Sequence, residues 1–448
     1  MEDILKKQKT FFDSHSTLSY EFRRKQLIKL KELILSNEFK LIEAFQKDFN
    51  KSPFEVYSTE TGLVIKEINY LIRNLKRFMT PKRATTSLVN FPSKGSLIYE
   101  PYGTVLIISP FNYPFHLTFL PLVGAIAAGN TVIVKPSSKT SNVLGVISEI
   151  LANFDEEYIK VISKVDNLFD YKYDYIFFTG SSNVAKLIIE KQAKFLTPMT
   201  LELGGKSPCI VDIDADIELS AKRIVWGKFL NAGQTCIAPD YVLVHKEIKD
   251  KLISRLKYYI NIFYYNEGVL STTFTNIIDQ ANIERLKALI DEKKLIFGGK
   301  TIKKQLEPTI LNNVTFEDKV MQQEIFGPIL PLIEFEEFYD VINMLKNKPK
   351  PLALYYFSKD KVKQKYVQEH TSSGSVCIND VVMHVSEANL PFGGVGESGF
   401  GSYHGEKTFT TFSHQKSILN KSIRVDNTLR YPPYNLRSIR VVKRLFKL

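Results

Sequence analysis

Apolar residues recur at helical spacing over the first 80 residues of the chain. Leu27, Leu30 and Ile34 follow one another at intervals of three and four residues, and residues 41–45 begin a second stretch of this kind. Residues 82–100 are rich in serine, threonine and basic side chains and have no helical periodicity. The pattern therefore predicts a group of helices followed by an extended arm.

Short apolar runs then alternate with longer amphipathic or apolar stretches. Residues 104–108, 131–134 and 175–178 are rich in β-branched or aromatic side chains, which is typical of strands buried on both faces of a parallel sheet. Residues 117–128 and 183–194 fit helices between and after these strands. Strand–helix alternation of this kind predicts a doubly wound sheet, whose ligands bind at the carboxyl ends of its strands.

The chain has 448 residues, more than one hydrophobic core usually organises. Strand–helix alternation begins again after the first predicted sheet and continues to about residue 400. We predict an α/β fold in three parts. A doubly wound domain comprises residues 1–80 and 101–202, a second α/β domain comprises residues 203–407, and an extended oligomerisation arm and tail comprise residues 81–100 and 408–448.

Composition narrows the function classes. The net charge is +12, but basic residues are spread among acidic ones and no nucleic-acid-binding motif occurs, so we expect no nucleic-acid partner. The three cysteines, Cys209, Cys236 and Cys377, lack metal-ligand spacing, which predicts no metal site and a reducing compartment. Cys209 and Cys377 lie in strand-like runs and are interpreted as small buried residues. Without a signal-peptide core or an apolar run of about 20 residues, we expect a cytoplasmic protein.

Two segments carry polar side chains suited to acyl chemistry. Asn112 follows a predicted strand end in the segment FNYP, and its side-chain N–H could donate to a developing oxyanion. A loop asparagine that caps a turn would give the same pattern. Glu202 lies between two leucines in the segment LELGGKSP. Burial would raise the pKa of its carboxyl, which suits a general base, whereas a surface glutamate entering a turn is the alternative.

Two further segments carry a thiol and a carboxylate–aromatic pair. Cys236 lies in the segment NAGQTCIAP, where small residues let a ligand approach the backbone closely. Its thiolate could attack a carbonyl carbon while its own backbone N–H holds the oxyanion. Glu324 and Phe326 lie two residues apart in the segment QEIFGP and could hold a ribose and a ring. Each segment alone would also fit an ordinary buried residue or turn.

Together, these four segments, in this order and spacing, resemble the aldehyde dehydrogenase superfamily over nearly the whole chain. The segment PFGGVGESG at residues 391–399 is also similar to that family. Three later segments resemble its class 3 branch, which acts on fatty and aromatic aldehydes. These are GSYHG at residues 401–405, TFSH at residues 411–414 and LRYPPY at residues 429–434.

The resemblance implies an enzyme that oxidises medium or long aliphatic, or aromatic, aldehydes to carboxylic acids. Cys236 would attack the aldehyde, Asn112 and the Cys236 backbone N–H would stabilise the oxyanion, and Glu202 would activate the water that hydrolyses the thioester. The doubly wound domain would bind a nicotinamide cofactor, and the second domain would be catalytic. The loops around Tyr57, Phe115 and Phe392 would select the substrate.

The resemblance also implies NAD or NADP as the cofactor. Ser138 stands where the class usually has a glutamate that binds the adenine-ribose hydroxyls, and its absence removes a like-charge barrier to the 2′-phosphate of NADP. The positions implied to contact the cofactor are Pro110, Phe111, Lys135, Ser138, Thr179, Gly180, Ser181, Val184, Leu203, Gly204, Glu324 and Phe326.

The resemblance further implies a homodimer, with the arm and tail contributing to the contact. Residues 436–448 alternate between basic and apolar side chains. An amphipathic helix on an anionic membrane would have this pattern, but an arm that packs on a partner subunit, or a frayed tail, is the favoured alternative.

Two other function classes remain open at this point. An esterase could use Cys236 and Glu202 to hydrolyse activated esters without a cofactor. A binding protein could have kept the fold without catalysis, although the presence of Cys236, Glu202 and Asn112 argues against it. Cofactor-dependent turnover would separate the three.

Overall fold

The computed structural model describes residues 1–426, 428–434 and 436–446. The first 80 residues are helical, as predicted. The helices are α1 (Glu2–Asp13), α2 (Tyr20–Ser36), α3 (Glu38–Phe49), α4 (Pro53–Val56) and α5 (Gly62–Met79), with a π-helical turn at Tyr57–Thr61 between the last two. The Ser19 and Ser52 hydroxyls cap α2 and α4 by accepting backbone N–H groups of the first turns. Thr80 is extended and ends α5 before Pro81.

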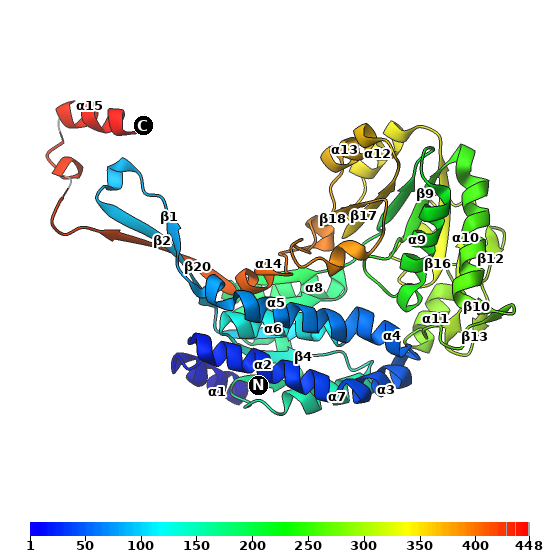
Figure 1. The fold of residues 1–448 in the computed structure, drawn as a ribbon, viewed down its shortest axis with the longest axis horizontal. Coiled ribbons are helices and arrows are strands. Elements are labelled where there is room, and N and C mark those ends of the chain that lie inside the picture. The colour runs from blue at the N-terminus through cyan, green and yellow to red at the C-terminus, as the bar shows by residue number, and fades with distance from the viewer. Residues whose placement is uncertain (427, 435, 447–448) are drawn as a thin grey trace.

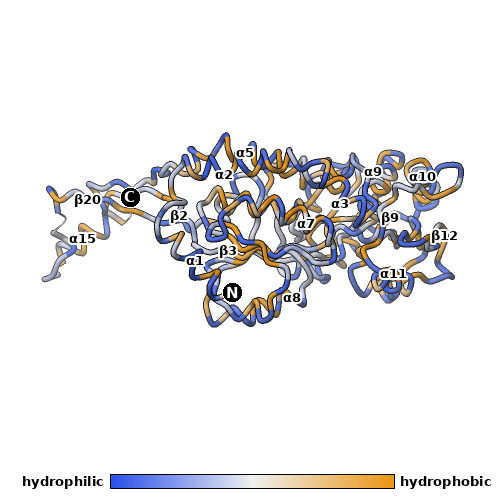
Figure 2. The backbone as a smooth tube through the Cα atoms, turned by 90° about the horizontal axis from the view of Figure 1, so that it is seen from below, coloured by the Kyte–Doolittle hydropathy of each residue, from blue (hydrophilic) through white to orange (hydrophobic). Residues whose placement is uncertain are grey.

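The predicted doubly wound sheet is present, with strand order β19-β7-β6-β3-β4-β5. Its strands are β3 (Thr104–Ile108), β4 (Thr131–Lys135), β5 (Ile159–Val161), β6 (Tyr175–Thr179), β7 (Met199–Glu202) and β19 (Gly399–Phe400). All neighbours are parallel except β19, which pairs antiparallel with β7. Figure 2 shows that the residues around β3, in the middle of this domain, are hydrophobic. The fold-class prediction is therefore confirmed for this part.

Three helices connect these strands: α6 (His116–Ala128), α7 (Ser141–Leu151) and α8 (Ser182–Gln192). Every residue of α6 is buried, including Pro121 in its interior, because α6 packs against α2, α5 and α14 as well as the sheet. Gly129 adopts a left-handed conformation and ends α6. Strand β5 has three residues and was not predicted, because a run this short leaves no distinctive apolar pattern.

The second sheet has strand order β12-β15-β16-β9-β8-β17-β18. Its strands are β8 (Pro208–Val211), β9 (Tyr241–His245), β12 (Leu295–Phe297), β15 (Thr309–Leu311), β16 (Ile329–Phe335), β17 (Ala353–Phe357) and β18 (Ser375–Ile378). Only β12 is antiparallel to its neighbour. The accompanying helices are α9 (Ile217–Phe229), α10 (Lys249–Tyr264), α11 (Gln280–Lys287), α12 (Phe338–Lys346) and α13 (Lys361–His370). This part also confirms the α/β prediction.

A three-stranded antiparallel sheet projects from the body as an arm (Figure 1). It consists of β1 (Lys82–Ala84), β2 (Ser93–Pro101) and β20 (Ser413–Lys421), and α15 (Leu436–Leu445) lies at its end. Before entering the arm, the chain returns to the first sheet through β19 and packs α14 (Glu406–Thr411) on α6. The chain thus rejoins the first domain before residue 407, where we predicted a boundary. Among the described helices, none is long and apolar enough to cross a bilayer.

Candidate active site

A cavity of about 770 Å³ lies between the two domains and reaches Cys236. The first domain contributes residues of the α4–α5 segment and of the loop after β3, and the second contributes residues of α9, α10 and their loops. Most of its lining side chains are apolar or aromatic, and Cys236 stands among them with Tyr113 and Thr235. A chamber lined mostly by apolar side chains, with polar groups among them, is suited to a small molecule that has one reactive group.

The loop that carries Cys236 makes a sharp turn after α9. Asn231 and Ala232 have φ angles of 53° and 52°, and Gly233 has a φ of 72°. A side chain at Gly233 would come within 2.3 Å of the Gly327 carbonyl oxygen, so only glycine fits there. Left-handed non-glycine residues are strained, and they persist where the surrounding contacts hold them. The turn presents the Cys236 thiol to the cavity.

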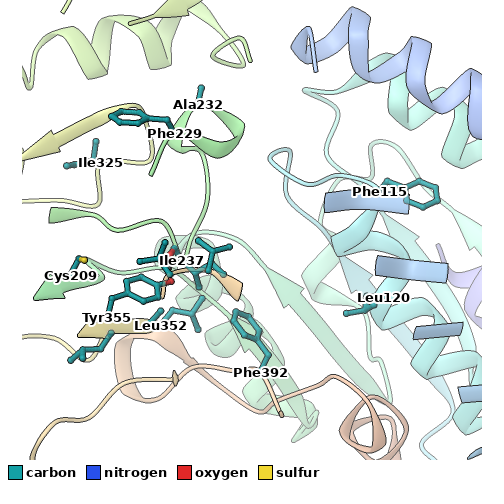
Figure 3. Packing of buried hydrophobic residues seen from close by; sticks show 14 of the residues in the cluster. Phe115, Leu120, Cys209, Phe229, Ala232, Ile237, Ile325, Leu352, Tyr355 and Phe392 are labelled. Carbon is teal, nitrogen blue, oxygen red and sulfur yellow. Dashed lines mark hydrogen bonds between the residues drawn. The ribbon is translucent and has the colours of Figure 1, made fainter. Parts of the chain in front are cut away.

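The thiol of Cys236 is half-buried and lies near two carboxyl groups. Burial raises the pKa of Cys236 to about 12, and the charges of Glu324 and Glu202 contribute to this rise. The thiol form therefore predominates at neutral pH in the structure as it stands. Tyr355 fixes the adjacent backbone, since its hydroxyl donates to the Ile237 carbonyl, and Figure 3 shows the two residues side by side.

Asn112 follows β3 and is held against the cysteine loop by reciprocal hydrogen bonds. Its side-chain Nδ2 donates to the Gln234 carbonyl at 3.0 Å, and the Asn231 side chain donates to the Asn112 carbonyl at 2.9 Å. Within the described residues, this leaves one of the two N–H bonds of the Asn112 amide without a protein acceptor. The structure therefore brings Asn112 and the Cys236 loop together, as the sequence predicted.

Glu202 lies at the carboxyl end of β7 and is 2% exposed. In the part of the chain that the structure describes, neither of its carboxyl oxygens has a hydrogen-bond partner. Burial raises the pKa of Glu202 well above its ordinary value. A buried, unpartnered carboxyl within electrostatic reach of a thiol has the properties that a general base needs. The alternative of a surface glutamate entering a turn does not hold.

A second cleft, of about 590 Å³, runs along the start of α8. Gly180, Ser181, Gly204 and Glu324 line it, together with Lys206. Ser181 is the N-cap residue of α8 and its side chain caps no backbone N–H, so the free N–H groups of the first turn favour an anion such as a pyrophosphate. A side chain at position 204 would approach the Glu324 carboxylate to 2.3 Å, so glycine there leaves room for that carboxylate. The cleft fits a dinucleotide.

Opposing influences set the pKa of the Glu324 carboxyl in this cleft. Burial and the charge of Asp240 raise the pKa of Glu324 to about 8, while a backbone hydrogen bond from Gly205 and the charges of Lys206 and Lys228 oppose the rise. Lys206 is itself paired with Asp240 and donates to the Gln323 carbonyl at 2.9 Å. A hydrogen bond to a ligand hydroxyl would satisfy the Glu324 carboxylate.

The other predicted cofactor positions lie outside the lining of this cleft. Pro110, Lys135 and Thr179 lie at or just after the carboxyl ends of β3, β4 and β6, which form one edge of the parallel sheet. The rings of Phe111 and Phe326 meet edge to face with centroids 5.8 Å apart. The remaining three positions comprise two exposed residues, Ser138 and Val184, and one buried residue, Leu203.

The three loops that we expected from the sequence to select the substrate all contribute to the cavity lining. Phe392 lines the cavity. The loop around Phe115 contributes Tyr113, His116 and Leu117, whereas the Phe115 ring itself is fully buried, stacks on Phe119 and lies apart from the Ile237 group in Figure 3. Tyr57 is half-exposed outside the lining, although its neighbours Phe54, Ser58 and Thr59 contribute to it.

The cavity-lining residues of α9 and α10 were not predicted from the sequence. Trp226, Phe229, Ile262, Phe263 and Tyr264 line the cavity from these two helices and the end of α10. In the sequence, their helical spacing is indistinguishable from that of residues that pack into a core. Only the placement of the second domain against the first shows that these side chains face a chamber.

The fold and this pair of clefts define a two-domain α/β enzyme with a dinucleotide-binding sheet and a thiol in the lining of a mostly apolar chamber. Residues 1–418 match the model of the Aldehyde dehydrogenase family, and the chain belongs to that family. It is an oxidoreductase that oxidises aldehydes to carboxylic acids with NAD or NADP.

Relatives match the chain over almost its whole length. It is 44% identical over 448 residues to a 4,4'-diaponeurosporen-aldehyde dehydrogenase of Staphylococcus aureus, covering 98% of this chain and 97% of the relative. It is 40% identical to aldehyde dehydrogenase family 3 member A2 of Rattus norvegicus, covering 97% and 91%. A substrate-bound structure of Staphylococcus aureus AldH superimposes with a TM-score of 0.97, 43% identity and 99% coverage of both chains.

A more distant structure shares the same architecture. Glyceraldehyde-3-phosphate dehydrogenase GapN of Methanocaldococcus jannaschii, described as complexed with NADP, is 25% identical and superimposes with a TM-score of 0.83. The alignment covers 94% of each chain.

Proposed function

We propose that the protein oxidises medium or long aliphatic, or aromatic, aldehydes through a thioester on Cys236. The observation that carries this proposal is the cavity of about 770 Å³, lined mostly by apolar and aromatic side chains, that reaches Cys236. An elongated apolar substrate would fill the chamber and bring its aldehyde group to the thiol. The Staphylococcus aureus relative, whose name specifies a 4,4'-diaponeurosporen aldehyde, supports this substrate class.

In this mechanism, the Cys236 thiolate forms a bond to the aldehyde carbon. The free N–H of the Asn112 amide and the backbone N–H of Cys236 donate to the resulting oxyanion. When bound, the nicotinamide cofactor accepts the hydride that leaves this carbon. Glu202 then takes a proton from water, which attacks the thioester carbon and releases the acid and the Cys236 thiolate.

The cofactor would lie along the carboxyl edge of the first sheet. The N–H groups at the start of α8 would face its phosphates, and Glu324 would accept hydrogen bonds from a ribose. Lys135 would approach the other ribose, while Phe111 and Phe326 would lie beside the ring. These roles rest on the resemblance and on the fit of the cleft to a dinucleotide.

Chain length tests the proposed substrate class. Across a series of straight-chain aldehydes from four to ten carbons, we expect kcat/KM to rise by about threefold for each added methylene, because each buries further apolar surface. Leu117→Trp, which narrows the cavity, should reduce this gain for the long aldehydes only. Leu35→Trp, on the outer face of α2, serves as the matched control. A kcat/KM that is independent of chain length would contradict the proposal.

We further propose that the enzyme accepts NADP because Ser138 replaces a glutamate. Ser138 is exposed in the loop after β4, and its neighbour Lys139 pairs with Asp279 at 2.7 Å. In Ser138→Glu, the new carboxylate should repel the 2′-phosphate, so the ratio of kcat/KM for NADP to that for NAD should fall by at least about tenfold. Ser138→Ala should leave this ratio unchanged. An unaltered ratio in Ser138→Glu would place the phosphate elsewhere.

We propose that the arm joins two copies of the chain in a cytoplasmic homodimer, and that α15 contacts an anionic membrane. The arm projects from the body, and among the described residues β20 is an outer strand of its sheet. Helix α15 exposes Ile439 and Val441 alongside Arg440, Lys443 and Arg444. The three free cysteines suit a reducing compartment. Analytical sedimentation of the full chain should give the mass of a dimer, and a monomer would overturn the proposed dimer.

In a separate assay, the protein should cosediment with phosphatidylserine vesicles at low salt. Equal affinity for neutral vesicles would overturn the proposed contact with an anionic membrane.

A further inference from the structure

A short segment that forms part of the cavity lining, residues 51–61, contacts both loops that carry the proposed catalytic groups. It comprises α4 and the π-helical turn, and single-turn π-helical insertions are frequent at functional sites. The loop after β3, which carries Asn112, belongs to the first domain. The loop after α9, which carries Cys236, belongs to the second. A segment that binds both can set the separation of Asn112 and Cys236.

Glu60 holds the loop that carries Asn112. Its Oε2 accepts the backbone N–H of His116 at 2.8 Å, and its Oε1 accepts from the Lys51 ammonium at 3.1 Å. Both side chains are fully buried. His116 begins α6, so the carboxylate fixes the point at which the chain leaves the Asn112 loop and enters the helix.

Lys51 extends this contact to the cysteine loop. Its Nζ lies 4.6 Å from the centre of the Tyr113 ring, and the Tyr113 hydroxyl shares a 2.7 Å hydrogen bond with the Thr235 hydroxyl. Thr235 immediately precedes Cys236. The buried ion pair therefore supports, through one aromatic ring, the residue next to the thiol.

Glu55 holds the cysteine loop directly. Its Oε1 accepts the backbone N–H of Asn231 at 3.0 Å, and its Oε2 accepts the Thr275 hydroxyl at 3.3 Å. Asn231 is the first of the left-handed residues in the turn, and its side chain donates to the Asn112 carbonyl. Glu55 thus stabilises a strained turn at the residue that links the two loops.

We propose that Lys51, Glu55 and Glu60 are positioning residues that together fix the geometry between Asn112 and Cys236. The inference rests on the proposed function, because it assigns these residues to the catalytic roles given above. A buried ion pair adds little net stability compared with apolar residues of the same volume, because both charges lose their hydration. The Lys51–Glu60 pair is instead suited to specifying one loop geometry.

Substitution of Glu60 and of Glu55 should change kcat and the alkylation rate of Cys236 differently. Glu60→Gln should lower kcat by about 10- to 100-fold through a displaced oxyanion donor, with KM within threefold of the wild type. It should leave the rate of Cys236 alkylation by iodoacetamide within twofold, since alkylation needs no oxyanion donor. Glu55→Gln should lower both kcat and the alkylation rate, since it releases the turn that presents the thiol.

Asp212→Asn is the matched control, because Asp212 is a fully buried carboxylate paired with Lys363 at 2.8 Å and contacts neither loop. It should change thermal stability but leave kcat and alkylation at wild-type values. Should Glu60→Gln fail to fold, the double variant Lys51→Met/Glu60→Gln, which removes both buried charges, should show the same loss of kcat.

If both glutamine variants retain wild-type kcat and alkylation rates, or lose them only in proportion to the control, the segment is structural. Cys236→Ser, measured in parallel, separates this outcome from failure of the proposed function, because only the latter leaves Cys236→Ser active.

Discussion

Cys236→Ser is expected to lower kcat/KM for aldehyde oxidation by at least about a thousandfold, since loss of a nucleophile removes the covalent path. A serine hydroxyl is a far weaker nucleophile than a thiol at the same position. The hydrogen bonds that hold the loop involve Asn231 and Gln234 rather than the thiol, so the fold should survive. Reduced-cofactor absorbance at saturating NAD or NADP measures the effect.

Cys377→Ser is the matched control, because Cys377 is half-buried on the edge strand β18, and this variant should leave turnover unchanged.

The wild-type rate of aldehyde oxidation should also rise with pH between 7 and 10. The thiolate is the reactive form, burial raises the pKa of Cys236 to about 12, and below its pKa the thiolate fraction grows about tenfold per pH unit. Undiminished turnover by Cys236→Ser would exclude the thioester path.

Glu202→Gln is expected to slow thioester hydrolysis by about 10²- to 10⁴-fold, because the glutamine amide cannot accept a proton from water. Thioester formation does not require this base, so the first turnover should remain fast. Rapid mixing should therefore show a burst of reduced cofactor, about one equivalent per Cys236, followed by a slow steady state.

Glu67→Gln provides the control for this second prediction. Glu67 is another buried carboxylate with a raised pKa, and it accepts the Gly405 backbone N–H at 2.9 Å on α5. This variant should show no burst beyond that of the wild type. A slow first turnover in Glu202→Gln would assign Glu202 to thiol activation rather than to hydrolysis.

Much of the fold was predictable because its strands are buried on both faces. The runs at residues 104–108 and 175–178 give unbroken apolar signals, and the structure has strands at both. Strand β5 escaped prediction because three residues carry no pattern, and the return of the chain through β19 depends on two residues that pair across the sheet. Short elements are specified by tertiary pairing, which a linear pattern does not contain.

Some residues of the candidate site could also be predicted from the sequence, and others could not. Cys236, Glu202 and Asn112 could be singled out because their segments combine reactive side chains with small or turn-forming neighbours. The buried Lys51–Glu60 pair gave no signal, since a lysine and a glutamate nine positions apart in a charged helical region look solvated. The direction of the Phe115 ring could not be predicted for a related reason: sequence shows that an aromatic is near a loop, but not whether its ring faces the core or a cavity.

The most direct test of the thioester is mass spectrometry of Glu202→Gln mixed with decanal and NAD or NADP and quenched in acid during the burst. The account predicts that a decanoyl group is attached to the peptide that contains Cys236, in an amount equal to the cofactor reduced. Reduction of cofactor with no acyl group on this peptide, or with the acyl group on another residue, would contradict the account.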